Sequence, residues 1–431
     1  MIKRKISEDT YSLDRVPKEA RVSLVNVTLV RMGMATALSQ FMLGATLGHG
    51  MTFWNALLAT CLGSLLLEFV ALGLGLAGMK EGVSISLLAR WTGFGRLGSA
   101  LIGLAIAISL LGWFGVQNSV LAEGLSYSLD YKINFVWIAA FSGILLTVLV
   151  AFGFRALSWT AKISVPLFCL VVGWIIFYLF KDGSYLDLMN SSPKGNLLTL
   201  GEGTTIISGV VIIGALITPD ISRYCKNNNH VFWMITLSVI VGEFIINAIA
   251  ILMAHALEAA DIVTIMTHSA GWIGLLSVIL SAIKVNDINL YSSSLGLSNT
   301  IKIISNKKTN YVFLTVSLGI IGTLLSVFGI LNYFVDFLSM LGVIFPPIAG
   351  VMLVDYYILK TSRKILDETR EEGLLPDDSS TPLIGWSAIF ACIVGTLVGV
   401  YFNFGIPSLN SILVAGVAYW LLMKMKIYIE I

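Results

Sequence analysis

The stretch SAIKVNDINLYSSSLG at residues 281–296 decides how the rest of this 431-residue chain is interpreted. It places Lys284, Asn286, Asp287 and Asn289 within two helical turns of a segment that is otherwise apolar enough to cross a membrane. Ionisable side chains cost roughly 2.5–3.5 kcal/mol each at the centre of a bilayer, so they indicate function by default. We therefore expect the surrounding chain to be a scaffold in which these charges are tolerated.

The composition predicts an all-α membrane protein that crosses the bilayer many times. Hydrophobic residues make up 57% of the chain and charged residues only 12%, whereas soluble domains carry about 25% charged residues. The net charge of +2 gives no indication of nucleic-acid binding. The four cysteines lie far apart in no disulfide or metal spacing, and the charged N-terminal segment predicts no cleavable signal peptide.

Twelve segments are long and apolar enough to span a bilayer, which takes about 20 residues each. The predicted spans are 23–49, 54–79, 97–127, 133–154, 157–180, 204–224, 231–255, 272–290, 311–330, 334–359, 382–402 and 408–424.

Lys and Arg are distributed unevenly between the two sides of these spans. With the N-terminus inside, 21 of the 27 fall in cytoplasmic segments and three fall outside. Because positive residues are retained on the cytoplasmic side, both termini are predicted to be cytoplasmic. The predicted units are a tail (1–22), two five-helix repeats (23–180 and 204–359), a cytoplasmic loop (360–381) and two last helices with a tail (382–431).

Glycine-rich stretches occur in the first span of each repeat. The first carries GATLGHG at 44–50, and the sixth carries GVVIIGALITP at 209–219. Gly and Pro weaken helices, and non-helical backbone at membrane depth survives only where it lines a cavity. Interrupted helices at corresponding positions predict an inverted-repeat transporter with a midplane site. The alternative is that these glycines only permit close helix packing.

Six ionisable side chains within the spans are candidates for a role: Arg31, Glu68, Lys162, Glu243, Lys284 and Asp287. They can neutralise one another as structural ion pairs, and Arg31 and Lys162 are near enough to cytoplasmic ends to snorkel. Glu68 and Glu243 lie deeper, which leaves structural pairing and proton handling both open. Lys284 lies well inside its span, which favours a functional role.

The third span contains GWFGVQN at residues 112–118. Trp113 and Gln117 are four residues apart and share a helical face. An indole beside an amide that donates and accepts hydrogen bonds suits a flat polar heterocycle, although a membrane Trp also serves in packing. The chain has no enzyme motif, and no symmetric pore motif of the kind a channel needs.

Further motifs are VPKEAR at 16–21, LAR at 88–90, NDINLY at 286–291 with SLG at 294–296, and PPIAGV at 346–351 with DY at 355–356. Together with the glycine and tryptophan motifs, they resemble the nucleobase:cation symporter-1 family, and within it the bacterial cytosine-permease (purine/pyrimidine permease) branch. The resemblance implies a leucine-transporter-type fold, with ten core helices in two inverted repeats, broken first and sixth helices, and two peripheral helices.

The resemblance also implies alternating-access import of a nucleobase-like ring, such as cytosine, in the inner membrane of a bacterial cell. Sodium or protons would be the coupling ion, and the partners would be the small heterocycle and the bilayer, with the monomer functional and no nucleic acid bound. In similar proteins the tryptophan of the third span stacks on the ring, and nearby amides bond its edge. The implied substrate site contains Trp113, Gln117, Asn286 and Asn289, with Gly112, Gly44, Val210 and Val211 around them.

Two departures from the family pattern change these expectations. The first departure is in the substrate pocket. Cytosine permeases have an aromatic residue where this chain has Val210 and Val211, and a Gln where it has Leu110. We therefore expect a pocket shaped for another heterocycle, or one less selective than a cytosine site.

The second departure is at the cation site. Sodium-coupled relatives carry a Thr-Thr-Asn-Asp run, which is Lys284-Val285-Asn286-Asp287 here. Hard cations need oxygen ligands, and Lys and Val supply none. We predict no sodium site and no cofactor, with Lys284 as a tethered surrogate for the ion, Asp287 beside it and Lys162 as a second candidate.

Coupling would be to protons if Lys284 releases its proton, and absent if Lys284 stays charged. The rivals are a proton-coupled amino-acid transporter of the same fold and a channel.

Overall fold

The computed structural model is helical throughout the part of the chain that it describes. The described residues are 14–35, 38–152, 156–181, 183, 185–305, 309–377, 379, 381–402 and 404–429, and no β-strand occurs among them. The prediction of an all-α protein is confirmed.

The α-helices in chain order are α1 (Leu24–Ala35), α2 (Leu38–Gly50), α3 (Phe53–Glu81), α4 (Ile85–Ala89), α5 (Gly95–Ser128), α6 (Phe135–Ala151), α7 (Ala156–Lys181), α8 (Tyr185–Met189), α9 (Leu200–Leu216), α10 (Thr218–Ser222), α11 (Asn228–Ser238), α12 (Ile246–Leu257), α13 (Ile262–Ser305), α14 (Tyr311–Val327), α15 (Phe334–Ile344), α16 (Pro346–Leu353), α17 (Arg363–Glu371), α18 (Trp386–Tyr401) and α19 (Pro407–Ile429). Three π-helical turns, η2 (Arg90–Phe94), η3 (Val239–Ile245) and η5 (Val354–Leu359), and two 3₁₀ turns, η1 (Lys18–Ala20) and η4 (Ile330–Tyr333), complete the helical elements.

Each of the twelve predicted spans coincides with one helix or with an interrupted series of helices. Seven described stretches are long and apolar enough to cross a membrane by length and composition, and four shorter apolar helices lie in α6, α7, α14 and α18. The pair α1 and α2 accounts for the first span.

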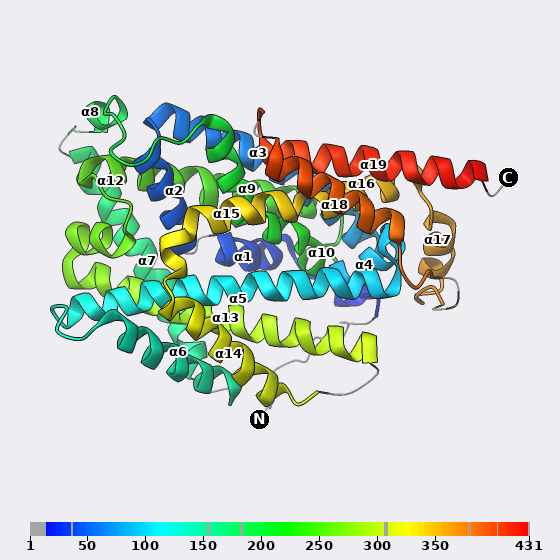
Figure 1. Ribbon diagram of the computed structural model, residues 1–431, viewed down its shortest axis with the longest axis horizontal. Coiled ribbons are helices and arrows are strands. Elements are labelled where there is room, and N and C mark those ends of the chain that lie inside the picture. The colour runs from blue at the N-terminus through cyan, green and yellow to red at the C-terminus, as the bar shows by residue number, and fades with distance from the viewer. Residues whose placement is uncertain are drawn as a thin grey trace.

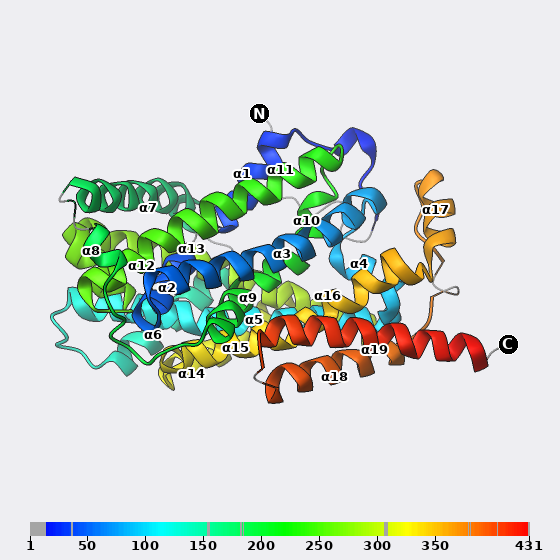
Figure 2. The ribbon, with the colours of Figure 1, turned by 90° about the horizontal axis from the view of Figure 1, so that it is seen from above.

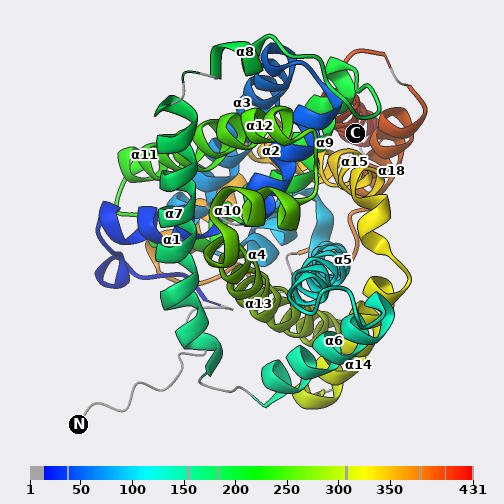
Figure 3. The same ribbon diagram turned by 90° about the vertical axis from the view of Figure 1, so that its left-hand side faces the viewer.

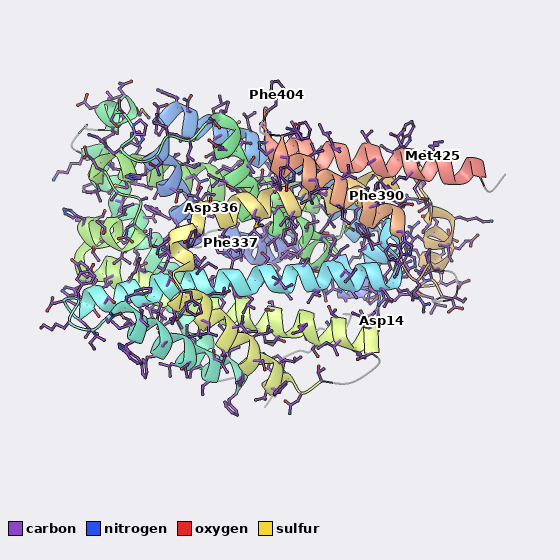
Figure 4. All side chains as sticks on the ribbon, in the orientation of Figure 1. Asp14, Asp336, Phe337, Phe390, Phe404 and Met425 are labelled. Atoms are coloured by element: carbon purple, nitrogen blue, oxygen red, sulfur yellow. The ribbon has the colours of Figure 1, made fainter. Side chains whose placement is uncertain are left out.

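The long helices lie along the long axis of the molecule, with α17, α4 and the C-terminal end of α19 at one end and α8 at the other (Figure 1). The last two helices, α18 and α19, pack together along one edge, and α7 lies along the opposite edge (Figures 2 and 3). Apolar side chains cover this outer surface. Phe404, Phe390 and Met425 are 89%, 56% and 59% exposed (Figure 4), as expected for residues that face lipid.

The interior is organised by the contact between α5 and α13. The Ser293 hydroxyl donates to the carbonyl oxygen of Ala107 at 2.7 Å, and the Thr300 hydroxyl donates to that of Ala100 at 3.1 Å. A β-carbon at Gly296 would lie 3.3 Å from the Ala107 side chain. Small residues and short hydroxyls are the means by which membrane helices approach closely.

The sixth span is interrupted, as predicted. Helix α9 ends at Leu216, Ile217 adopts φ −81° and ψ 4°, and α10 begins at Thr218 with Pro219 in its first turn. A Thr199–Glu202 capping box begins α9 on the other side. The break therefore lies three residues beyond Gly214, near the proline.

The first span differs from the prediction in where it is interrupted. Helices α1 and α2 are separated by residues 36–37, which lie outside the described residues, whereas α2 continues through the glycine run to Gly50. A β-carbon at Gly44 would lie 2.8 Å from the Asn247 backbone of α12, and one at Gly48 would lie 2.7 Å from the Ile251 carbonyl oxygen. These glycines thus allow α2 to pack against α12, and the expected break at this run was wrong.

Gly44→Val is expected to destabilise the protein because the added methyl groups would overlap the α12 backbone. Overpacking of this kind costs about 1–3 kcal/mol in well-packed cores. The measurement is the thermal unfolding midpoint in detergent. The matched control is Gly173→Val in α7, where an added β-carbon meets no atom within 4 Å. Equal midpoints for the two variants would contradict the packing role.

Candidate functional site

A cavity of about 730 Å³ lies between the interrupted helices and the α5–α13 pair. Trp113 of α5, Gln40 of α2 and Val210 of α9 form part of its wall. Arg96 and Lys302 also line it, and they belong to the ends of α5 and α13 that lie near α4 and α17 (Figure 1). The cavity therefore extends from the middle of the helix bundle to that end of the molecule.

Trp113 is held in the wall by two aromatic contacts from α15. The indole meets the Phe334 ring at 6.0 Å and the Phe337 ring at 5.6 Å between centroids, with interplanar angles of 79° and 75°. Edge-to-face pairs of this kind fix ring orientation. A β-carbon at Gly112 would lie 2.6 Å from the Phe337 ring, so the glycine admits Phe337 (labelled in Figure 4) beside the indole.

Two buried amides on the cavity wall have unsatisfied polar atoms. Asn289 of α13 is 6% exposed, and its Nδ2 has no hydrogen-bond partner among the described residues. Gln40 is 3% exposed, and its Oε1 is likewise unpartnered within the described part of the chain. A buried polar atom without a partner costs about 1–3 kcal/mol. The wall thus contains one unpaired donor atom and one unpaired acceptor atom, both buried, with Val210, Val211 and Val285 as apolar wall.

Five of the predicted substrate or coupling residues are not among the described residues of the cavity wall: Gly44, Gly112, Gln117, Asn286 and Asp287. Asn286 turns toward α5 instead. When the side-chain oxygen and nitrogen are assigned so that both have partners, the nitrogen donates to the Phe114 carbonyl oxygen at 3.2 Å and the oxygen accepts from the Asn118 backbone N–H at 3.1 Å. In this orientation Asn286 joins α13 to α5.

Gln117 is fully buried one helical turn beyond Trp113. Neither its Oε1 nor its Nε2 has a hydrogen-bond partner among the described residues. It lies behind the wall rather than on it, because the cavity ends at Trp113 along α5.

Lys284 and Val285 both line the cavity, as the sequence interpretation requires of a coupling site. At 1.5 Å per residue, Lys284 lies about 30 Å from the end of α13 at Ser305, which is too deep for its side chain to reach that surface. Lys162 belongs to α7, but its side chain lies outside the described residues. No group of three or more His, Cys, Asp or Glu in the described ranges is arranged to hold a metal ion.

Two charged residues of the wall have contacts that the sequence does not predict. Arg31 of α1 donates from Nη1 to the Gly214 carbonyl oxygen of α9 at 2.6 Å, so it points into the cavity and does not snorkel outward. Glu243 lies on η3 and accepts a hydrogen bond from the Ser64 hydroxyl of α3. Gln40 was missed altogether, although a glutamine in the apolar run LSQFMLG is a recognisable signal.

Comparison with known proteins places these features in a family. The profile described as "Permease for cytosine/purines, uracil, thiamine, allantoin" matches residues 15–422. The cytosine permease of Escherichia coli (strain K12) is 29% identical over 416 residues, which cover 96% of this chain and 94% of that protein.

Two solved structures share the fold. The inward-facing conformation of Mhp1 superposes with a TM-score of 0.78 at 17% identity, over 97% of this chain and 96% of that one. Mhp1, a nucleobase-cation-symport-1 family transporter, in a closed conformation with bromovinylhydantoin bound gives 0.69 at 18% identity, over 96% and 95%. The predicted leucine-transporter-type architecture is confirmed at the level of fold.

The family profile matches nearly the whole chain, and the members of that family are membrane permeases rather than enzymes. The protein is a multi-pass membrane transporter that belongs to the family of permeases for cytosine, purines, uracil, thiamine and allantoin.

Proposed function

We propose that this protein imports a planar, nucleobase-like heterocycle across the bacterial inner membrane by alternating access, without sodium. The observation that carries the proposal is the indole of Trp113 on the cavity wall, with unsatisfied amide atoms of Asn289 and Gln40 on the same wall. A flat ring with donor and acceptor groups on its edge can stack on the indole, and it can pair with the two amide atoms once their side chains turn into the cavity.

The ring face and the ring edge are recognised by different parts of the wall. An aromatic side chain offers a stacking platform to any base, and amide groups read the pattern of donors and acceptors. Val210 and Val211 supply no second aromatic face, which supports a substrate range wider than cytosine. Gln117, buried without a partner behind Trp113, stays a proposed contact for another step of the transport cycle.

The chemistry of the proposed coupling site supports sodium independence. Lys284 and Val285 bring an ammonium group and a methyl surface to the cavity wall, whereas a sodium ion needs oxygen ligands. The Lys284 charge takes the place of the ion, with Lys162 and Asp287 as further coupling candidates. No metal ion or other cofactor is required by this scheme.

We further propose that both termini are cytoplasmic and that the monomer is the transporting unit. The excess of Lys and Arg on that side supports this orientation, in which the cavity opens to the cytoplasm. Residues 23–180 and 204–359 would form the two inverted repeats, with substrate bound between them.

A binding screen on the purified protein tests the substrate class. We expect cytosine, uracil, hydantoins or pyrimidine precursors of thiamine to raise the unfolding midpoint, and free amino acids to leave it unchanged. A ligand at about 100 times its Kd adds about 2.7 kcal/mol of stability. Stabilisation by an amino acid and by no heterocycle would favour the proton-coupled amino-acid transporter. A channel would instead show flux that neither saturates nor concentrates the solute.

A further inference from the structure

Glu243 is a buried carboxyl group in the cavity wall to which neither the fold nor the substrate assigns a role. It lies on the π-helical turn η3, which interrupts the helical stretch from α11 to α12. Its side chain is 6% exposed and faces the cavity, and it accepts a hydrogen bond from the Ser64 hydroxyl. Single π-turns within membrane or soluble helices occur frequently at functional sites.

We propose that Glu243 carries the coupling proton and that Arg31 is its counter-charge. This inference rests on the proposed function, since it names the group through which heterocycle import is driven. An ionisable residue inside a membrane protein that faces a water-accessible cavity is typical of a proton relay.

The charged groups around Glu243 are few. The elements packed against η3 are α1, α3, α11 and α12. Arg31 approaches from α1 and Glu68 from α3, and both act electrostatically on the Glu243 carboxyl group. Glu68 accepts from the Thr236 hydroxyl at 2.5 Å and is not among the described residues of the cavity wall.

The titratable groups of α11 and α12 are too distant to share the proton. His230 and His255 lie 13 and 12 residues from Glu243 in sequence, which is about 18–20 Å along a helix. From α13, Lys284 and Lys302 are the charged residues that line the cavity.

Arg31 links the proton site to the broken helix. Its guanidinium donates to the Gly214 carbonyl oxygen, in the last turn of α9 before the interruption at Ile217, and it also feels the charge of Glu243. A deprotonated Glu243 attracts the guanidinium toward η3. When Glu243 is neutral, the guanidinium stays bonded to the Gly214 carbonyl oxygen. Protonation of Glu243 therefore determines whether Arg31 binds η3 or α9.

The proton balance is simple. With the site open outward, a proton from external water forms an O–H bond with the Glu243 carboxylate. With the cavity open to the cytoplasm, that bond breaks and the proton passes to water in the cavity. Because Glu243 is the group that takes up and releases this proton, one positive charge crosses with each neutral heterocycle.

The test uses full-length protein in liposomes, with radiolabelled cytosine and uracil as probes and the membrane potential clamped. For one proton per substrate, a gradient of about one pH unit drives about tenfold accumulation. We expect the wild type to approach this value. Glu243→Gln should lose accumulation and still exchange internal for external base, because exchange moves no net proton.

Two further variants sharpen the outcome. Glu68→Gln, which neutralises a neighbouring carboxyl group away from the cavity, should accumulate base like the wild type. Arg31→Gln combined with Glu243→Gln removes both charges together and should again exchange without accumulating, which guards against misfolding caused by one unpaired charge.

Accumulation by either Glu243→Gln protein would overturn the proton role. Wild-type transport that ignores the pH gradient would overturn it too, and would leave heterocycle import standing. Wild-type protein that neither binds nor exchanges any base would instead refute the proposed function itself.

Discussion

Replacing Trp113 with alanine is expected to weaken heterocycle binding by about 5- to 150-fold, because stacking on an aromatic side chain is worth about 1–3 kcal/mol per base. The indole lies on the cavity wall, and the Phe334 and Phe337 rings hold it in place. Alanine removes the platform and leaves the Asn289 and Gln40 amides to bind the ring edge alone. The measurement is Kd by isothermal titration or by competition with a labelled base.

The control separates loss of stacking from loss of packing. Trp137 of α6 is 72% exposed on the outer surface, so Trp137→Ala should leave Kd unchanged. Trp113→Phe keeps a smaller aromatic face and should recover part of the affinity. If Trp113→Ala bound the base as tightly as the wild type, while its unfolding midpoint was normal, the indole would not be the platform.

Sodium is expected to have no effect on wild-type binding and a large effect once oxygen ligands are restored at the coupling site. The double variant Lys284→Thr, Val285→Thr removes the ammonium group and places two hydroxyls on the cavity wall. When two ligand sites are coupled, binding at one typically changes the affinity of the other by about 5- to 150-fold. Saturating sodium should therefore tighten base binding by about tenfold in this variant.

The single variant Val285→Thr is the matched control, since it adds one hydroxyl and keeps the Lys284 charge. It should be as insensitive to sodium as the wild type. The measurement is base Kd in sodium chloride against choline chloride at equal ionic strength. A sodium-sensitive wild type would show that the ion binds elsewhere, and that Lys284 does not take its place.

The span pattern was predictable because it depends on local properties of the chain. Three signals determine helix structure within a few residues of where they occur: long apolar runs, the cap formed by Thr199 and Glu202, and the proline after Gly214. The positions of the helices and the interruption of the sixth span therefore agree with the structure. Trp113 and Lys284 were reached from the residues themselves, and Asn289 and Val285 from the family resemblance; all four line the cavity.

The remaining features depend on partners that are distant in sequence. Gly44 is a packing site because Asn247 and Ala250 approach it, and a glycine run alone does not distinguish close packing from a break. Asn286 faces the backbone of α5, whereas Asn289 lines the cavity. The rotation of α13 about its own axis determines this difference. Arg31 appeared free to snorkel, but the carbonyl oxygen of Gly214 draws it inward.

The central claim is sodium-independent import of a planar heterocycle, and uptake by liposomes that contain only this protein tests it most directly. Radiolabelled cytosine, uracil and hydantoin are supplied under an inward sodium gradient, an inward proton gradient, or neither. We predict that at least one of these rings is concentrated under the proton gradient, and that the sodium gradient gives no more than the level without a gradient. Concentration driven by sodium alone would contradict the account.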